Sequence, residues 1–225
     1  MTTDPRAAPT VSVAILDGGL ATRLGGGDKG ALVVGGRRIL DWQLDAVAPL
    51  TDDVCLVGGH DHPADPAATA ARVIGRNVRP RRVHDRVPGR GPLGGLDAAL
   101  AHARHDVVLV LAGDMPCVTT QLLRHLVSVL HEGVDVVVPR TKDGYHPLCA
   151  VYTRACLTAV ARRLDAGQLA LVGLFDELHV QIADTASLEA FGHPDVLLAN
   201  VNTPEDLRRI ETVARPEVPS YPNRP

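Results

Sequence analysis

The stretch Val11–Gly30, V-S-V-A-I-L-D-G-G-L-A-T-R-L-G-G-G-D-K-G, decides how this chain folds. Its first part, Val11–Leu16, is an apolar run rich in β-branched residues, which predicts a buried strand. The second part is rich in glycine and carries Arg23 and Lys29. Glycine lets backbone N–H groups approach a ligand closely, and basic side chains add positive charge. The two parts together predict a strand followed by a long loop that binds the phosphates of a nucleotide.

Two familiar glycine motifs do not describe this loop. The pattern G-x-G-x-x-G occurs at 25–30, but that motif should begin directly at the end of the strand, which is Leu16. No acidic residue closes a second strand about 20 residues later, as ribose binding would require. In a phosphate-binding loop of the Walker type, Lys29 would follow a glycine and precede a serine or threonine, but its neighbours are Asp28 and Gly30. We interpret the stretch as a long loop around a triphosphate; a plain surface loop is the alternative.

The alternation of short apolar runs with helical patterns predicts an α/β fold with a mostly parallel, doubly wound sheet. The 225 residues, 45% of them hydrophobic, suffice for one sizeable domain. We expect a single domain at 11–213 between flexible, proline-rich tails at 1–10 and 214–225. Strands are expected at 11–16, 54–57, 83–84, 107–111, 134–138, 148–152, 179–182 and 197–199, and helices at 38–48, 92–104, 119–131, 153–165 and 204–212.

Composition argues against several classes of partner. A net charge of −3 gives no field that favours nucleic acid, and 3% aromatic residues supply no platform for stacking bases. No apolar run approaches the roughly 20 residues of a membrane span, and the amino terminus lacks the apolar segment of a signal peptide. The four cysteines form no C-x-x-C pair and indicate reduced thiols of a cytoplasmic protein. We therefore expect neither nucleic acid nor membrane as a partner.

Two carboxylates follow predicted strands. Asp114, in L-A-G-D-M-P, comes at the carboxyl end of the expected central strand, where open α/β sheets bind ligands. Mg²⁺ prefers one or two carboxylates together with phosphate oxygens, so Asp114 is a candidate metal ligand. Asp85 could support a metal or bind a ribose, and the glycines of G-P-L-G-G-L at 91–96 would let a helix N-terminus approach a base or phosphate. The alternative is ordinary turn and helix-start chemistry.

Two later motifs carry polar side chains that could contact a second substrate. His146, in D-G-Y-H-P-L, could touch an acceptor, although a lone histidine before proline is more often a turn residue. In N-V-N-T-P-E-D-L, Thr203 and Asp206 predict a capped helix start. Capping leaves Asn200 and Asn202 unexplained, and their spacing would let both face the same side of a strand end.

Taken together, these motifs resemble the molybdenum cofactor guanylyltransferases, which add GMP from GTP to molybdenum-bound molybdopterin. The family opens on L-A-G-G-x-x-x-R-M-G-G-x-D-K. The likeness covers about Val11 to Ile210 and implies a three-layer, Rossmann-like nucleotidyltransferase domain, with a mostly parallel mixed sheet covered by helices on both faces. The matching residues are Leu16-Asp17-Gly18-Gly19, Arg23-Leu24-Gly25-Gly26, Asp28-Lys29, Asp85, Gly91-Pro92-Leu93, Asp114-Met115-Pro116, His146-Pro147-Leu148 and Asn200-Val201-Asn202-Thr203-Pro204.

The resemblance also implies roles for individual residues. Nucleotide contacts would come from Leu16, Asp17, Gly18, Lys29, Asp85 and Asp114, with Asp114 also binding Mg²⁺. Lys29, Arg23 and Asp114 would carry catalysis, and His146, Asn200 and Asn202 would receive the acceptor. The expected partners are GTP, the molybdopterin cofactor and, transiently, proteins that insert and deliver that cofactor in the cytoplasm.

Asp17 departs from the family motif, which has alanine at this position. A carboxylate beside GTP costs affinity unless it is turned away or paired. It could instead accept hydrogen bonds from guanine N1–H and N2–H₂, and the sequence does not choose between these. The alternatives to guanylyl transfer are a related CMP- or sugar-phosphate nucleotidyltransferase and a GTP-binding homologue without catalysis, in which Asp17 marks a decayed site.

Overall fold

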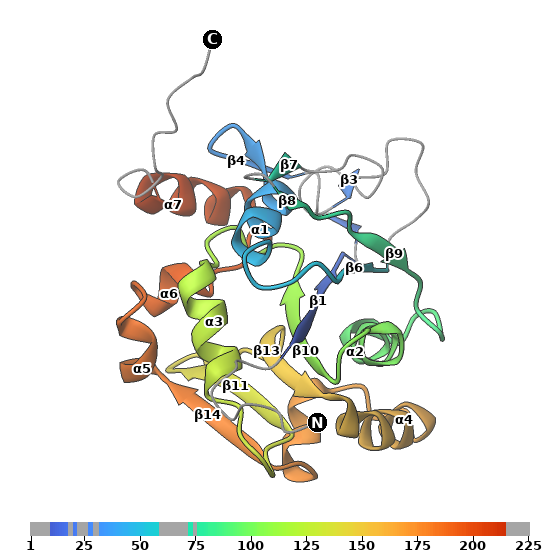
Figure 1. Ribbon diagram of the computed structural model, residues 1–225. Helices are drawn as coiled ribbons and strands as arrows, with labels where there is room; N and C mark the ends of the chain where they lie inside the picture. Colours follow the sequence, from blue (N-terminus) through green and yellow to red (C-terminus); the bar gives the residue numbers. More distant parts are fainter. Residues whose placement is uncertain are drawn as a thin grey trace.

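The computed structural model describes residues 10–17, 20–21, 27–28, 32–58, 72–73 and 76–214 (Figure 1). Its main sheet has eight strands in the order β12-β11-β13-β10-β1-β6-β9, with β14 also pairing with β11. These strands are β1 (Val11–Leu16), β6 (Val54–Val57), β9 (Arg81–Val83), β10 (Val107–Ala112), β11 (Val136–Thr141), β12 (Gly144–Tyr145), β13 (Cys149–Thr153) and β14 (Val180–Asp184). Three two-stranded ribbons complete the strands: β2 (Leu20–Ala21) with β3 (Gly27–Asp28), β4 (Val33–Val34) with β5 (Arg37–Arg38), and β7 (Arg72–Val73) with β8 (Arg76–Asn77).

The sheet is mixed and its centre is parallel. β1 pairs in parallel with β10 on one side and with β6 on the other, and β6 pairs in parallel with β9. β13 is antiparallel to both β10 and β11, β12 is antiparallel to β11, and β14 is parallel to β11. The predicted mostly parallel mixed sheet is therefore confirmed. We call the edge at which β1, β6, β9 and β10 end the carboxyl edge.

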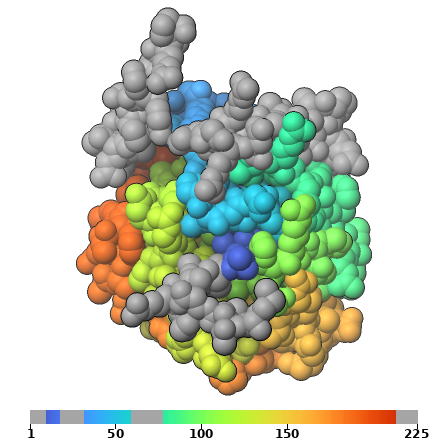
Figure 2. Space-filling view, viewed as in Figure 1, coloured from blue at the N-terminus to red at the C-terminus, as the bar shows by residue number. Residues whose placement is uncertain are grey.

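Helices cover both faces of the sheet, which confirms the expected three layers. α1 (Ile39–Val47) and α3 (Thr120–Ser128) contribute to one core cluster, and α2 (Gly91–His102) and α4 (Leu157–Asp165) contribute to the other (Figure 1). Figure 2 shows α1 in light blue beside yellow-green α3 on one face of the molecule. The remaining helical elements are η3 (Arg154–Cys156), η4 (Leu171–Asp176), α5 (Thr185–Glu189), α6 (Pro194–Leu197) and α7 (Pro204–Ala214).

Strand β10 is apolar throughout because both of its faces are buried. Successive side chains of a strand point to opposite faces of the sheet. Leu109 and Leu111 accordingly pack in the cluster that includes α1 and α3, while Val108 and Val110 pack in the cluster that includes α2 and α4. All four side chains are fully buried. A central strand with helices on both sides needs this composition, as the sequence predicted.

Gly95 lets α2 pack closely on the end of β1, and Gly94 lets the segment before α2 pack closely on the helix. A Cβ atom at Gly95 would lie 2.8 Å from Leu16 Cδ2, and one at Gly94 would lie 2.9 Å from Arg90 Cβ. The glycines expected to let this helix approach a ligand thus have a packing function in the structure. Gly95 sets the distance between α2 and Leu16.

The outer elements differ from the prediction. The strand expected at 197–199 is wrong, because Leu197 is the last residue of α6, a short helix that begins at Pro194 in the position where proline is tolerated. β9 ends at Val83 instead of including His84, which is exposed. β11 continues through Pro139, beyond Val137, where its pairing with β13 ends.

The ends of the predicted domain lie partly outside the described residues. α7 extends through Ala214, the first residue of the expected carboxyl-terminal tail, and residues 1–9 and 215–225 are not among those described. Within the described ranges, no helix combines the length and apolar character needed to cross a membrane.

A buried carboxylate links several strands where they begin, at the edge of the sheet opposite the carboxyl edge. Asp53, 1% exposed, accepts hydrogen bonds from Ser12 Oγ at 2.6 Å, from the Arg104 backbone N–H at 2.9 Å and from Arg81 Nε at 3.1 Å. Burial opposes ionisation of Asp53, but these three bonds outweigh it, so its pKa lies below 3.8. One side chain thus joins the starts of β1, β6 and β9.

Candidate active site

The turn after β10 holds Asp114 against the end of β1. The Gly113 backbone N–H donates to Leu16 O at 3.0 Å. A Cβ atom at position 113 would lie 3.1 Å from Leu16 O and 3.4 Å from Asp17 Oδ1, so a side chain here would press on the end of β1. Asp114 is buried, with 4% of its surface exposed. Three of the predicted nucleotide residues, Leu16, Asp17 and Asp114, therefore lie together at the carboxyl edge.

Gln43, which sequence reasoning missed, fixes the same turn from the side of α1. Its Nε2 atom donates to Ala112 O at 2.6 Å and to Met115 O at 3.2 Å, so one amide group binds two backbone carbonyls, one before and one after Asp114. The Gln43 side chain is fully buried. A glutamine among apolar residues on the buried face of a helix was the signal that could have identified it.

The segment that contains the two predicted asparagines is attached to this turn. The Val201 backbone N–H donates to Asp114 O at 2.8 Å, and Val201 itself is buried. Asn200 and Asn202 on either side of it are exposed. The hydrogen bond brings together residues 87 positions apart in the chain, so two predicted acceptor residues adjoin the predicted metal ligand.

The helix start that follows has the capping box predicted from T-P-E-D. Asp206 Oδ2 accepts from the backbone N–H groups of Asn202 at 3.1 Å and Thr203 at 2.9 Å. Thr203 Oγ1 accepts from the Asp206 backbone N–H at 3.1 Å. These reciprocal bonds satisfy donors at the start of α7 and fix the backbone of the asparagine segment.

Asp17 is paired with an arginine that sequence reasoning did not single out. Its backbone N–H donates to Val57 O at 2.9 Å, which continues the pairing of β1 with β6. Its carboxylate Oδ2 lies 3.6 Å from Arg82 Nη1, and both side chains are buried. Of the possibilities that the sequence left open, pairing is therefore observed.

Asp85 follows β9 at the carboxyl edge, two strands from β1 in the sheet order. It is partly buried, and burial raises its pKa above 3.8 while the adjacent His84 acts in the opposite direction. Asp85 therefore lies at the same edge of the sheet as Asp114, but it follows a strand further from β1.

His146 lies further along the same edge. Its Nε2 atom is 2.9 Å from Thr141 Oγ1, and its backbone N–H donates to Pro139 O at 2.9 Å. Burial lowers the pKa of His146, and Asp143 and Asp195 only partly oppose this, which favours the neutral imidazole. Because β10 and β11 are both antiparallel to β13, they run in the same direction, and Thr141 at the end of β11 also lies at the carboxyl edge.

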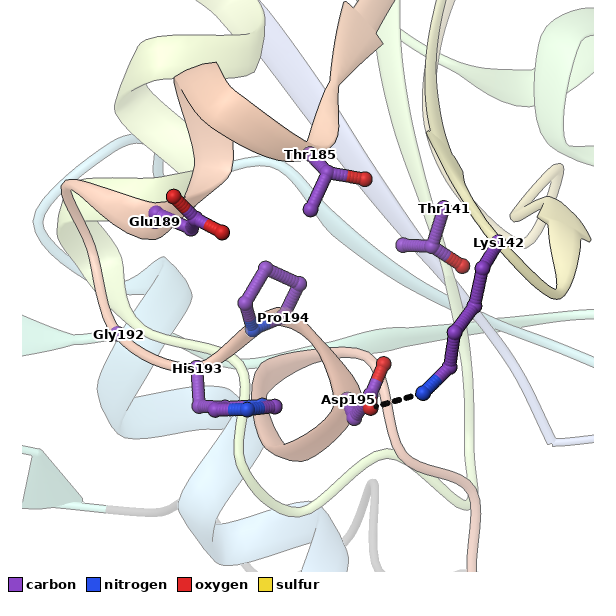
Figure 3. A pocket seen from close by; sticks show the side chains of 8 residues that line it. All are labelled: Thr141, Lys142, Thr185, Glu189, Gly192, His193, Pro194 and Asp195. Carbon is purple, nitrogen blue, oxygen red and sulfur yellow. Dashed lines mark hydrogen bonds and ion pairs between the residues drawn. The ribbon is translucent and has the colours of Figure 1, made fainter.

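A cavity of about 560 Å³ lies at the end of β11 (Figure 3). It lies between the end of β11 and the helices α5 and α6, and Thr141, the hydrogen-bond partner of His146, is part of its wall. An ion pair of 2.9 Å between Lys142 Nζ and Asp195 Oδ2 joins its two sides. The lining residues are Thr141, Lys142, Thr185, Glu189, Gly192, His193, Pro194 and Asp195.

The remaining predicted site residues, Gly18, Arg23 and Lys29, lie outside the described residues. In the part of the chain that is described, no group of three or more His, Cys, Asp or Glu side chains is arranged to hold a metal ion. Asp114 would thus supply a single carboxylate. This fits Mg²⁺, which keeps several waters and takes further oxygens from substrate phosphates.

Residues 13–181 match the family model of the MobA-like NTP transferase domain. The chain belongs to this family. A molybdenum cofactor guanylyltransferase from Desulfosudis oleivorans is 31% identical over 89% of this chain and 94% of its own length. The solved structure of molybdopterin-guanine dinucleotide biosynthesis protein A from Archaeoglobus fulgidus has a TM-score of 0.73 and 25% identity, covering 91% of this chain and 99% of its own.

The structure of Rv0371c from Mycobacterium tuberculosis, in complex with manganese, shares the fold of this MobA-like chain. Its TM-score is 0.59 at 23% identity, covering 90% of this chain and 98% of its own. The family match confirms the resemblance drawn from the sequence motifs and the expectation of a nucleotidyltransferase. The structural match confirms the expected fold class.

Proposed function

We propose that the protein transfers GMP from GTP to the terminal phosphate of molybdenum-bound molybdopterin, giving the guanine dinucleotide form of the cofactor and pyrophosphate. The observation that carries the proposal is the hydrogen bond from Val201 N–H to Asp114 O. It joins the strand-end carboxylate suited to a metal–triphosphate complex to the exposed amides of Asn200 and Asn202, which suit a polar acceptor. Related chains that bear the guanylyltransferase name supply the identity of the two substrates.

In the proposed reaction a phosphate oxygen of the acceptor attacks the α-phosphorus of GTP in line. A new P–O bond forms as the bond between the α-phosphorus and the bridging oxygen of pyrophosphate breaks, and the electron pair leaves with pyrophosphate. The attacking oxygen is already anionic, so no general base is needed. The protein therefore has to align the two substrates and offset their negative charge.

The side chain of Asp114 would hold Mg²⁺, which when bound would offset charge on the triphosphate. Manganese in the Mycobacterium tuberculosis neighbour supports a divalent cation for this fold. The bonds from Gln43 fix the turn that carries Asp114, so the carboxylate would need little rearrangement on binding. We assign charge compensation on the triphosphate to Arg23 and Lys29.

The nucleotide would also contact Leu16, Asp17, Gly18 and Lys29, and Asp85 would help to orient it from the end of β9. The backbone carbonyl oxygen of Leu16 and the carboxylate of Asp17 already lie beside the Asp114 turn, next to Gly113.

The acceptor would be bound by His146, Asn200 and Asn202. A neutral imidazole and two amides offer both donors and acceptors, which suits a pterin ring with donors and acceptors along its edge. The cavity lined by Thr141, the hydrogen-bond partner of His146, has room for part of such a molecule. We place the reaction in the cytoplasm, with transient contacts to proteins that insert and deliver the cofactor.

Replacing Asp114 by asparagine tests the proposal. We expect turnover, measured as pyrophosphate release with GTP, Mg²⁺ and molybdopterin-bearing acceptor, to fall by about 10²-fold or more, the usual size for loss of an electrostatic contact in the transition state. Asp52→Ala, a change at an exposed carboxylate, is the control and should leave turnover unchanged. Activity of Asp114→Asn within a few-fold of the wild type would contradict the metal assignment.

A further inference from the structure

The carboxylate of Asp17 lies at an unfavourable place for a protein that binds a triphosphate. Asp17 directly follows β1 at the carboxyl edge and is 2% exposed. Its Oδ1 atom is within 3.4 Å of where a side chain on Gly113, the residue before Asp114, would begin. A buried negative charge here would repel the phosphates that Asp114 is proposed to bind through a cation.

Arg82 reaches this carboxylate from two strands away. β9, which carries Arg82, pairs with β6, and β6 pairs with β1. The Arg82 Nη1 atom donates to Gly58 O at 2.8 Å, at the end of β6, and lies 3.6 Å from Asp17 Oδ2. The Arg82 side chain is only 8% exposed. The guanidinium is thus fixed over the end of β6, with its charge directed at Asp17.

The preceding residue, Arg81, provides a comparison within the same strand. Its Nε atom lies 3.1 Å from Asp53 Oδ1, and Asp53 precedes β6 whereas Gly58 follows it. Two adjacent arginines of β9 therefore form ion pairs with buried aspartates at opposite edges of the sheet. Only the Arg82 pair lies at the edge that carries Asp114.

We infer that Arg82 is a positioning residue for nucleotide binding: it cancels the charge of Asp17 and holds that carboxylate toward β6, so that a triphosphate can bind beside it. This inference rests on the proposed function. It assigns Asp17 to the internal ion pair and not to recognition of the guanine edge. Loss of Arg82 should accordingly weaken GTP binding, because the charge of Asp17 is then uncompensated. Removal of the Asp17 charge as well should restore the affinity for GTP.

The test is a double-mutant cycle read by calorimetric binding of GTP–Mg²⁺ to the full chain, without acceptor. Arg82→Leu should weaken GTP binding on the order of tenfold or more, because an uncompensated buried charge then lies close to the triphosphate. Asp17→Asn, which keeps the shape but not the charge, should bind GTP at least as tightly as the wild type. The Asp17→Asn/Arg82→Leu variant should return to within about threefold of the wild type.

Arg81→Leu is the matched control. It removes an equal charge from the adjacent position of β9, so it should lower the thermal midpoint and leave the GTP dissociation constant unchanged. If Arg82→Leu does not fold, Asp17→Asn alone decides, because weakened binding of GTP in that variant means that the negative charge of Asp17 favours nucleotide binding, which overturns the inference. Equal loss of affinity in Arg82→Leu and the double variant also overturns it. Absence of GTP binding by the wild type contradicts the proposed function instead.

Discussion

Replacing Asp53 by alanine removes the carboxylate that joins the starts of β1, β6 and β9. In the structure this side chain accepts bonds from Ser12 Oγ, Arg81 Nε and the Arg104 backbone N–H, and it is 1% exposed. The side chains of Arg81 and Arg104 are 32% and 63% exposed, so water can replace much of what they lose. The main cost therefore comes from the buried Ser12 hydroxyl and the Arg104 backbone N–H.

Two charge-assisted hydrogen bonds of this kind contribute about 3 kcal/mol together after discounting for competition with water. For a chain of this size, a loss of 1 kcal/mol lowers the thermal midpoint by about 2–4 °C, so we expect a fall of about 6–12 °C. Thermal unfolding followed by circular dichroism measures it, with Asp52→Ala as the control at an exposed neighbouring carboxylate. A midpoint for Asp53→Ala within 2 °C of the wild type would refute the reasoning.

The same site predicts a dependence on pH. The pKa of Asp53 is lowered below 3.8 in the folded chain, so its ionised form contributes stability above that pH. That contribution is lost as the pH falls through the lower, folded pKa. The difference in stability between the wild type and Asp53→Asn should therefore be constant near pH 6 and shrink below about pH 4. Urea unfolding at several pH values checks this, and a difference that grows on acidification contradicts the assignment.

Three further changes test the site. Gln43→Leu leaves two buried carbonyls of the Asp114 turn without their donor, so it should cost about 1–3 kcal/mol in urea unfolding and reduce the kcat of pyrophosphate release; unchanged stability would show that these bonds are not needed. Gly95→Ala puts a Cβ 2.8 Å from Leu16 Cδ2 and 3.1 Å from Leu16 Cγ, so Leu16 must shift; we expect the gain of about 1 kcal/mol in helix propensity to be offset and GTP binding by calorimetry to weaken, and a variant that gains the full 1 kcal/mol in urea unfolding with wild-type binding would contradict the close packing. His146→Ala should raise the KM for the acceptor while the dissociation constant of GTP stays within about twofold, and the reverse pattern would move His146 to the nucleotide.

The centre of the sheet was predictable because hydrophobic pattern alone determines it. Val107–Ala112 is apolar on both faces, as is Val11–Leu16 apart from Ser12, and such a sequence is typical of a strand between two helical layers. The periphery was less predictable. The apolar residues at 197–199 suggested a strand, whereas Pro194 begins a short helix whose partners are distant in sequence.

Some residues of the candidate site were likewise predictable from the sequence, and others were not. The strand-end position of Asp114 followed from the order of strands, and the capping box at Thr203 followed from local spacing. The contributions of Gln43 and Arg82 could not be predicted from the sequence. Each side chain contacts a carbonyl or a carboxylate that only the tertiary fold brings near it. A polar residue on a buried helix face and an arginine within a strand were the available signals, and both need the fold before a partner can be named.

The most direct test of guanylyl transfer is pyrophosphate release by the purified protein with Mg²⁺, molybdopterin-bearing acceptor and each of GTP, CTP, ATP and UTP in turn. The account predicts release with GTP that depends on both acceptor and Mg²⁺, with formation of the guanine dinucleotide cofactor in equal amount. Release with CTP in preference to GTP, or binding of GTP with no release in the presence of acceptor, would contradict it.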